Sequence, residues 1–373
     1  MPNTDDFDAA DHHWMAQALQ LAAHGQTTAT PNPAVGCVIV SGDECVGSGW
    51  HERAGQPHAE ALALAAAGTK ARGATAYVTL EPCTVAGRTP PCASALVEAG
   101  IARVVYATRD PNPAVDGAGD DLLTRHGVQV QAGLMQANAE QLNEGFAMRM
   151  RHGRPFVTVK IAGSLDGASA MRSGESQWIT GTAARQDVQR LRARACAVLT
   201  GIGTVLADDP SLNVRDGFEP ATGRQPLRVV LDRSLRTPAD AKLLQLPGQV
   251  LILSADSQPG DPSDRIPNAL HCQVAESDVG LDLAAVVREL ARREINELLV
   301  EAGATLCGAL AAAGLIDRFV FYLAPTLLGS QTRRLLDTPG WLALADGMSL
   351  HTEDVTQVGP DLRIRAKPLR RLN

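Results

Sequence analysis

The sequence has no uncharged apolar run of about 18 residues, the length that a membrane-spanning helix needs. Its first eleven residues are polar and acidic, without the apolar stretch of a secretory signal peptide. We therefore expect a cytoplasmic protein without membrane contact. Positively charged residues are fewer than negatively charged ones: the chain has 34 Lys and Arg and 41 Asp and Glu, which gives a net charge of −7. This balance argues against a nucleic-acid partner, which would need a basic patch to neutralise its phosphates.

Cysteine is sparse as well, with seven residues scattered over the chain. An odd and scattered count argues against a disulfide framework and favours free thiols. Most of these cysteines are expected to be small buried hydrophobes. The cysteines interpreted in this way are Cys37, Cys45, Cys196, Cys272 and Cys307.

The length of 373 residues exceeds the range in which one hydrophobic core keeps growing, so two domains are expected. In both halves, helical segments alternate with apolar strand-like runs, which is typical of layered α/β domains. Gly153-Arg154-Pro155 interrupts the alternation, and we place the boundary there, with domains of residues 1–153 and 154–373. The predicted strands are residues 34–40, 76–80, 103–107, 156–161, 195–200, 227–231, 250–254, 296–300 and 318–323. The predicted helices are residues 13–24, 58–67, 93–100, 121–125, 137–151, 183–194, 283–293 and 305–313.

The triplet His58-Ala59-Glu60, followed by Cys83 and Cys92, carries the clearest chemical signal. Catalytic Zn²⁺ takes three protein ligands and leaves its fourth tetrahedral position to water. His58, Cys83 and Cys92 would be those ligands. Bound zinc lowers the pKa of water toward about 7. Glu60 would be the catalytic proton carrier outside the metal shell, the arrangement that zinc deaminases use to replace an amine on a ring carbon.

A purely structural zinc site is the main alternative for these residues. An H-x-E triplet alone is a weak signal, because histidine and acidic residues often meet on helix surfaces. Here, however, a strand-like run leads into Cys83 and a helical segment follows Cys92, so both thiols lie where a helix N-terminus favours anions. A structural site would normally be closed by a fourth Cys or His, and none lies at a suitable spacing. The pattern therefore favours catalytic zinc.

With these motifs the chain resembles the RibD family, the bifunctional deaminase/reductases of riboflavin biosynthesis. The resemblance implies an α/β protein with an N-terminal cytidine-deaminase-like α/β/α layer and a C-terminal dihydrofolate-reductase-like domain. The first domain would use Zn²⁺ to deaminate the phosphoribosylated diaminopyrimidinone, and the second would use NADPH to reduce the ribosyl group to ribityl. The family also implies a small-molecule substrate and a homo-oligomer. Beyond the zinc motif, the matching segments are residues 31–36, 110–113, 160–167, 173–179 and 204–210.

In the first domain the resemblance assigns the substrate to Asn32, His51 and Arg88. The Asn32 amide can both donate and accept at a pyrimidine edge, although Asn-Pro is also ordinary turn chemistry. The chain departs from the family after Cys83, where Val85 replaces a histidine that helps to hold the substrate phosphate, and Ala86 follows. Valine cannot donate a hydrogen bond, so Arg88 is expected to be the remaining cation on this loop.

In the second domain the resemblance implies two groups of contacts. Arginine suits a phosphosugar because its planar fork binds phosphate bidentately. The cofactor phosphates are expected where an apolar strand enters a helix through Gly303, since helix N-termini bind phosphate and no G-x-G-x-x-G is present. The implied substrate residues are Lys160, Ser176, Arg192, Leu212, Arg215 and Glu301. The implied cofactor residues are Ala162, Trp178, Thr204, Asp208, Gly303, Ala304, Thr305, Leu306, Cys307, Gly308 and Ala309.

Two other functions stay open at this point. A nucleoside or tRNA-base zinc deaminase with an unrelated C-terminal domain would share the zinc motif, but the matching segments after residue 160 and the acidic balance speak against it. A non-catalytic, zinc-stabilised binding protein is the other alternative. Glu60 disfavours it, because a structural zinc site needs no carboxylate outside its ligands.

Overall fold

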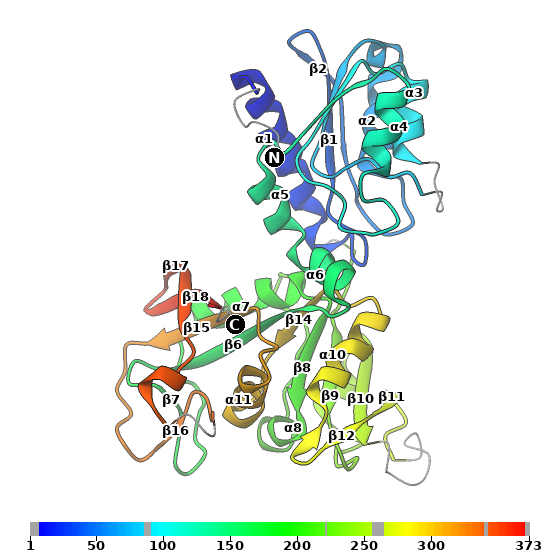
Figure 1. Cartoon of the computed structure of the whole chain (residues 1–373). Coiled ribbons are helices and arrows are strands. Elements are labelled where there is room, and N and C mark those ends of the chain that lie inside the picture. Colours follow the sequence, from blue (N-terminus) through cyan, green and yellow to red (C-terminus); the bar gives the residue numbers. More distant parts are fainter. Residues whose placement is uncertain (1–6, 86–90, 221, 256–264, 339–341, 370–373) are drawn as a thin grey trace. The chain divides into compact units, whose positions relative to one another are not determined.

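The computed structural model describes residues 7–85, 91–220, 222–255, 265–338 and 342–369. The chain divides into two compact units, Met1–Gly153 and Arg154–Asn373 (Figure 1). Within the described ranges, no helix is both long enough and apolar enough to span a bilayer.

A five-stranded sheet in the order β2-β1-β3-β4-β5 forms the centre of the first unit. β1 (Gly36–Ser41) pairs antiparallel with β2 (Glu44–Trp50) and with β3 (Thr75–Val78). β4 (Arg103–Tyr106) and β5 (Gln129–Ala132) continue the sheet in parallel with β3. Successive side chains of a strand point to opposite faces, so apolar strands of this kind must be covered on both sides.

Helices cover both faces of this sheet. On one face, Leu96 and Leu123 pack with Ile39 in the core beneath α2, α3 and α4. On the other face, Met15 packs with Val38 beneath α1 and α5. The result is an α/β/α sandwich, as the sequence predicts for this half. The helices are α1 (Ala9–His24), α2 (Ala59–Ala67), α3 (Cys92–Glu98), α4 (Ala118–Arg125), α5 (Gln136–Leu142) and α6 (Glu144–His152), with short 3₁₀ turns at Gly25–Thr27 and Gly68–Ala71.

Two glycines of β2 allow α2 to lie directly on the sheet. A Cβ atom on Gly47 would lie 2.2 Å from the carbonyl oxygen of Ala63, and one on Gly49 would lie 2.6 Å from the Cβ atom of Leu62. Both distances are well inside van der Waals contact, so larger residues at these positions would push the helix away. The close approach sets the position of α2, whose N-terminal end carries His58 and Glu60.

The second unit contains a nine-stranded sheet in the order β11-β10-β9-β8-β14-β6-β15-β18-β17. It is parallel from β11 to β15, whereas β18 runs antiparallel to both β15 and β17. Its strands are β6 (Phe156–Ser164), β8 (Ala197–Gly201), β9 (Leu227–Leu231), β10 (Val250–Ala255), β11 (Leu270–Val274), β14 (Glu297–Val300), β15 (Arg318–Ala324), β17 (Leu350–Val358) and β18 (Asp361–Pro368). Two small sheets pair β7 (Ala168–Met171) with β16 (Thr332–Arg334), and β12 (Glu276–Ser277) with β13 (Gly280–Leu281).

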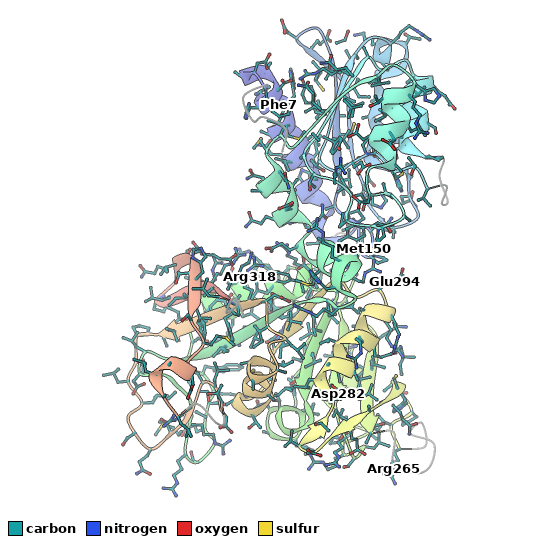
Figure 2. The ribbon with its side chains drawn as sticks, in the orientation of Figure 1. Phe7, Met150, Arg265, Asp282, Glu294 and Arg318 are labelled. Carbon is teal, nitrogen blue, oxygen red and sulfur yellow. The ribbon has the colours of Figure 1, made fainter. Side chains whose placement is uncertain are left out.

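Helices α7 (Thr182–Arg194), α8 (Ile202–Asp208), α9 (Lys242–Gln245), α10 (Leu283–Arg292) and α11 (Ala304–Ala312) belong to this unit. The Asp282 carboxylate caps α10 by accepting the N–H groups of Ala284 and Ala285, and Figure 2 labels it at the start of that helix. α8 follows β8 directly, and α11 follows the neighbouring strand β14. The N-termini of α8 and α11 therefore meet at the carboxyl edge of the parallel strands, where open α/β sheets bind their ligands.

Every predicted strand is present, with ends shifted by at most a few residues. The prediction omits the more polar strands, which lack a continuous apolar run. β17 illustrates the reason, since all of its residues are exposed or half-buried and most of them are polar. The omitted strands are β2, β5, β7, β11, β12, β13, β16, β17 and β18, and helices α8 and α9 are omitted as well.

Two further expectations are wrong. The predicted helix over residues 137–151 is interrupted at Asn143, where the backbone leaves helical geometry and the side chain bonds to the backbone of Ala34 instead. Asparagine readily makes such non-helical bonds, which explains the break. Cys45 is exposed and Cys272 is half-buried, whereas Cys37, Cys196 and Cys307 are buried as expected.

Replacement of Gly47 by alanine should destabilise the first unit by about 1–3 kcal/mol, the usual cost of overpacking. The new methyl group would meet the backbone of α2. Ser48→Ala, on the exposed side of the same strand, is the control and should leave stability unchanged. Denaturant unfolding of the full chain, followed by near-UV circular dichroism, measures both variants. Equal midpoints for Gly47→Ala and the wild type would contradict the packing argument.

Candidate functional site

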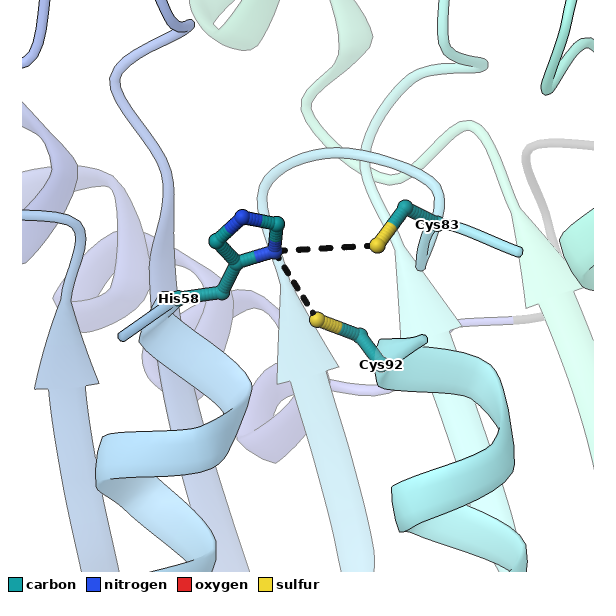
Figure 3. A group of neighbouring side chains, drawn as sticks. All are labelled: His58, Cys83 and Cys92. Atoms are coloured by element: carbon teal, nitrogen blue, oxygen red, sulfur yellow. Dashed lines mark hydrogen bonds between the residues drawn. The ribbon is translucent and has the colours of Figure 1, made fainter. Parts of the chain in front are cut away.

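The three predicted metal ligands meet at one point of the first unit. His58 lies at the N-cap of α2, Cys92 is the first residue of α3, and Cys83 lies in the loop between β3 and α3. Nδ1 of His58 lies 3.1 Å from Sγ of Cys92 and 3.6 Å from Sγ of Cys83 (Figure 3). All three ligand atoms lie within 4.8 Å of one another. One imidazole and two thiolates form a donor set that suits Zn²⁺, so these residues fit the metal.

The protonation of the two thiols favours metal binding. A hydrogen bond from Cys92 lowers the pKa of Cys83 to about 4, and His58 acts in the same direction. The same hydrogen bond, together with burial, raises the pKa of Cys92. The hydrogen bond between the two thiols therefore favours the thiolate form of one of them, and thiolates are the form in which cysteine binds zinc.

Glu60 lies beside the cluster without belonging to it. Its side chain is buried, with 4% exposed, near the N-terminus of α2. Burial raises the pKa of Glu60 to about 7, and the negative charge of Cys83 adds to the effect. A buried carboxyl group poised in this range can take up and release a proton at neutral pH, as a general acid–base catalyst must.

Glu81 holds the loop that carries Cys83, a role that was not predicted. Its buried carboxylate accepts the backbone N–H groups of Gly119 at 3.0 Å, Gly117 at 3.1 Å and Asp110 at 3.3 Å. The backbone N–H of Ala93 donates to the carbonyl of Cys83 at 3.1 Å. These bonds fasten Cys83 on both sides. The only sequence signal was a glutamate immediately before Pro82-Cys83.

Asn32 and His51 lie together next to His58. The His51 ring donates from Nδ1 to the Pro57 carbonyl at 3.1 Å and accepts from Nδ2 of Asn32 at Nε2, also at 3.1 Å. Burial lowers the pKa of His51, consistent with the neutral ring that this pattern requires. The ring centroids of His51 and His58 are 5.3 Å apart. The Asn32 amide is thus oriented, with Oδ1 and one N–H left for a further partner.

The loop between the two thiols is described only in part. Val85 is exposed at 47% and offers no hydrogen-bonding group. Ala86 and Arg88, on which the expected phosphate contact falls, lie outside the described residues.

In the second unit, Lys160, Arg192 and Glu301 form a charged cluster at the carboxyl edge of the sheet, in which Arg192 is buried and the other two are half-buried. Arg192 donates to both oxygens of Glu301, from Nε at 2.6 Å and from Nη2 at 3.0 Å. Val300 pairs with Val159, which places Glu301 and Lys160 side by side on neighbouring strands. Burial lowers the pKa of Lys160 and opposes the ionisation of Glu301, but the charge of Arg192 holds the pKa of Glu301 below its usual value.

The other implied substrate residues lie on two further segments of this unit, one of which contacts the cluster. Arg192 donates from Nη1 to the Asn213 carbonyl at 3.0 Å, which ties α7 to the segment that carries Leu212 and Arg215. Leu212 is buried and has a left-handed backbone conformation, with φ 51°. The positive charge of Arg215 helps to lower the pKa of Glu301. Ser176 lies in the irregular segment between β7 and α7.

The implied cofactor residues lie along the same edge. Ala162 is on β6, Thr204 and Asp208 are on α8, and Gly303 is the N-cap of α11. No heavy atom lies within 4 Å of a Cβ built on Gly303, so the backbone at this helix N-terminus is open to a phosphate, which fits a dinucleotide. The α11 segment is not uniformly open. Thr305 is exposed, whereas Cys307 and Gly308 are buried.

Trp178 is exposed at 70%, which is unusual for so large an apolar side chain. The guanidinium of Arg185 lies 4.7 Å from the centroid of its ring and donates to the Thr180 carbonyl at 2.7 Å. One side of the indole ring is thus supported by a cation. Arg185 was not predicted. In the sequence, an arginine that contacts an aromatic ring looks the same as an arginine on the solvent-exposed face of a helix.

The arrangement agrees with what the chain resembles among known proteins. Residues 8–108 match the cytidine and deoxycytidylate deaminase zinc-binding region, and residues 155–364 match the RibD C-terminal domain. The chain is 48% identical to the riboflavin biosynthesis protein RibD of Escherichia coli, over 94% of this chain and 98% of that protein. It is 46% identical to RibD of Haemophilus influenzae, over 97% and 99%.

Solved structures give the same result. One crystal form of Acinetobacter baumannii RibD superposes with a TM-score of 0.90 at 45% identity, over 97% of this chain and 99% of that one. The diaminohydroxyphosphoribosylaminopyrimidine deaminase/5-amino-6-(5-phosphoribosylamino)uracil reductase of Thermotoga maritima superposes with a TM-score of 0.85 at 31% identity, over 96% and 99%.

Cys83→Ser should lose or weaken zinc binding, because serine replaces a soft thiolate in a three-ligand site. Elemental analysis of the purified full chain gives the zinc content of each variant. Cys45→Ser is the matched control, since Cys45 is an exposed cysteine of the same unit outside the cluster. Full zinc occupancy in Cys83→Ser would eliminate Cys83 as a ligand.

Proposed function

The chain belongs to the RibD family of riboflavin-biosynthesis proteins, and on this basis we propose how its two units divide the family's two reactions. The protein is a bifunctional enzyme, a zinc-dependent deaminase and an NADPH-dependent reductase. Its fold class is the predicted one, cytidine-deaminase-like followed by dihydrofolate-reductase-like. We assign deamination to residues 1–153 and reduction to residues 154–373. The observation that carries the assignment is the convergence of His58, Cys83 and Cys92 beside the nonligand carboxyl group of Glu60.

In the deaminase unit, the substrate is the phosphoribosylated diaminopyrimidinone and the product is 5-amino-6-(5-phosphoribosylamino)uracil. Zinc held by His58, Cys83 and Cys92 would lower the pKa of a water molecule and make it nucleophilic at neutral pH. Glu60 would move the two protons of that water, one to the ring nitrogen and one to the departing amine, which leaves as ammonia. The Asn32 amide, oriented by His51, binds the edge of the pyrimidine, and Arg88 binds the substrate phosphate.

In the reductase unit, NADPH supplies the hydride that converts the ribosyl group to ribityl. The cofactor phosphates bind at the N-terminus of α11, where Gly303 leaves the backbone open. Lys160, Arg192 and Arg215 bind the phosphosugar. Among the described residues, Arg192 pairs with Glu301, Arg215 pairs with Asp216, and Lys160 lies near Glu301, so these three cations face two carboxylates.

The alternative of a nucleoside or tRNA-base deaminase is not favoured, because the relatives match over the reductase half as well. We further propose that the enzyme is cytoplasmic, binds no nucleic acid and forms a homo-oligomer. The net charge of −7 supports the second point. The edge strand β17 supports the third, since it lies at the end of the nine-stranded sheet and exposes Val355 at 58%, and edge strands invite pairing with another chain.

Glu60→Gln should keep its zinc, since the three ligands are untouched, but lose deaminase activity by about 10²–10⁴-fold, the usual contribution of a general acid–base group. Reduction of the separately supplied deaminated intermediate should persist. Ammonia release and NADPH oxidation are the two readouts, and exposed Glu98→Gln is the control. A near-normal rate of ammonia release in Glu60→Gln would show that another group moves the proton.

Lys160→Ala and Asp208→Ala should each impair the reductase while ammonia release continues, because both residues lie in the second unit. Lys160→Ala should raise the KM for the deaminated intermediate more than that for NADPH, whereas Asp208→Ala should mainly affect NADPH. Lys242→Ala, at an exposed lysine of the same unit, is the control. Loss of deamination in both folded variants would contradict the assignment of two separate sites.

A further inference from the structure

The side chain of Asn143 clamps the backbone of a residue that lies 109 positions away in sequence. Oδ1 of Asn143 accepts the N–H of Ala34 at 2.8 Å, and Nδ2 donates to the carbonyl of Ala34 at 2.9 Å. Asn143 is 8% exposed, and Ala34 is 4% exposed. Both bonds are therefore shielded from water, and neither backbone group of Ala34 has solvent as a ready substitute.

The clamped residue belongs to the loop that presents Asn32. Ala34 follows Asn32 by two positions and immediately precedes Val35, whose carbonyl accepts the N–H of His51 at 2.9 Å. Asn32 is itself held by its N–H to the Ala29 carbonyl at 3.1 Å and by its side chain to His51. His51 determines how the Asn32 amide is turned, whereas Asn143 determines where the backbone beneath it lies.

Two further hydrogen bonds connect the region around the α5–α6 break to the segment that carries Asn32. Nε2 of Gln26 donates to the Leu142 carbonyl at 3.4 Å, at the end of α5. Nη2 of Arg149, on α6, donates to the Pro31 carbonyl at 3.3 Å. The break between α5 and α6 thus makes a polar contact with both ends of the loop, although it lies outside the zinc-binding region matched at residues 8–108.

We propose that Asn143 is a positioning residue of the deaminase, which sets the place of the Asn32 amide against the pyrimidine ring. The zinc-binding region then supplies the ligands and the proton carrier, and the segment around the α5–α6 break completes the recognition of the base. This inference rests on the proposed role of Asn32 in substrate binding.

The test uses the full chain loaded with zinc. Asn143→Leu keeps the approximate size of the side chain and removes both bonds to Ala34. Misplacement of a binding group by about 1 Å can cost on the order of 10²-fold in rate, so we expect a loss of that order in kcat/KM for ammonia release. Zinc content and NADPH-dependent reduction of the deaminated intermediate should stay at wild-type levels. Asn138→Leu, at an exposed asparagine of α5, is the matched control and should behave as wild type.

A double-substitution cycle separates positioning from general stabilisation. If Asn143 acts through Asn32, Asn143→Leu should cause little further loss in an Asn32→Ala background, because independent sites add and coupled ones do not. Should Asn143→Leu lose zinc, the cycle is run with Asn143→Asp, which keeps an acceptor for the Ala34 N–H but replaces the donor with a carboxylate oxygen that faces the Ala34 carbonyl. Additive losses, or a wild-type kcat/KM for the Asn143 variant, would overturn the proposal while leaving the function intact. A wild-type rate for Asn32→Ala would instead overturn the proposed role of Asn32.

Discussion

The deaminase half depends on one geometric constraint, that three ligand atoms from separate segments meet within 4.8 Å. His58 and Cys92 occupy the starts of two helices, and Cys83 lies in the loop between β3 and α3. Because α2 packs on the glycines of β2, the position of His58 follows from the sheet. Glu60 follows from His58, since both lie at the start of the same helix. A small shift of α2 would therefore displace His58 and Glu60 together, which we propose as a metal ligand and the proton carrier.

Polar groups that are buried but satisfied hold the less regular parts of both units in place. Glu81 gathers backbone N–H groups around the Cys83 loop, and Asn143 pairs with both backbone groups of Ala34. In the second unit, Arg192 joins Glu301 to the segment around Asn213. Each of these side chains would be costly to bury alone, because an unpaired polar group in the interior loses its hydration without replacement. Together they make irregular segments as well defined as the strands beside them.

The two units use charge in different ways. Around the proposed zinc ligands, burial raises the pKa of Glu60 to about 7, and the negative charge of Cys83 adds to the effect. Around Glu301, cations outnumber carboxylates, and Arg192 keeps the carboxylate ionised despite its burial. The first environment suits proton transfer, and the second suits an anionic ligand. Both sites contain a glutamate: Glu60 lies at the start of α2, and Glu301 directly follows β14. The two carboxyl groups therefore differ because of the charges around them.

The sequence predicted the alternation of α and β elements, the boundary region, and the grouping of His58, Cys83 and Cys92. Those features have local signals: buried strands such as β9 are continuous apolar runs, and the ligands have characteristic residue types and spacing. The sequence did not predict that the helix around residue 143 breaks, that β17 and β18 extend the sheet, or that Arg192 pairs with Glu301. Each of these depends on a partner far away in sequence. An asparagine or arginine carries the same local preferences whether it faces water or a buried backbone, so the fold must first bring its partner to it.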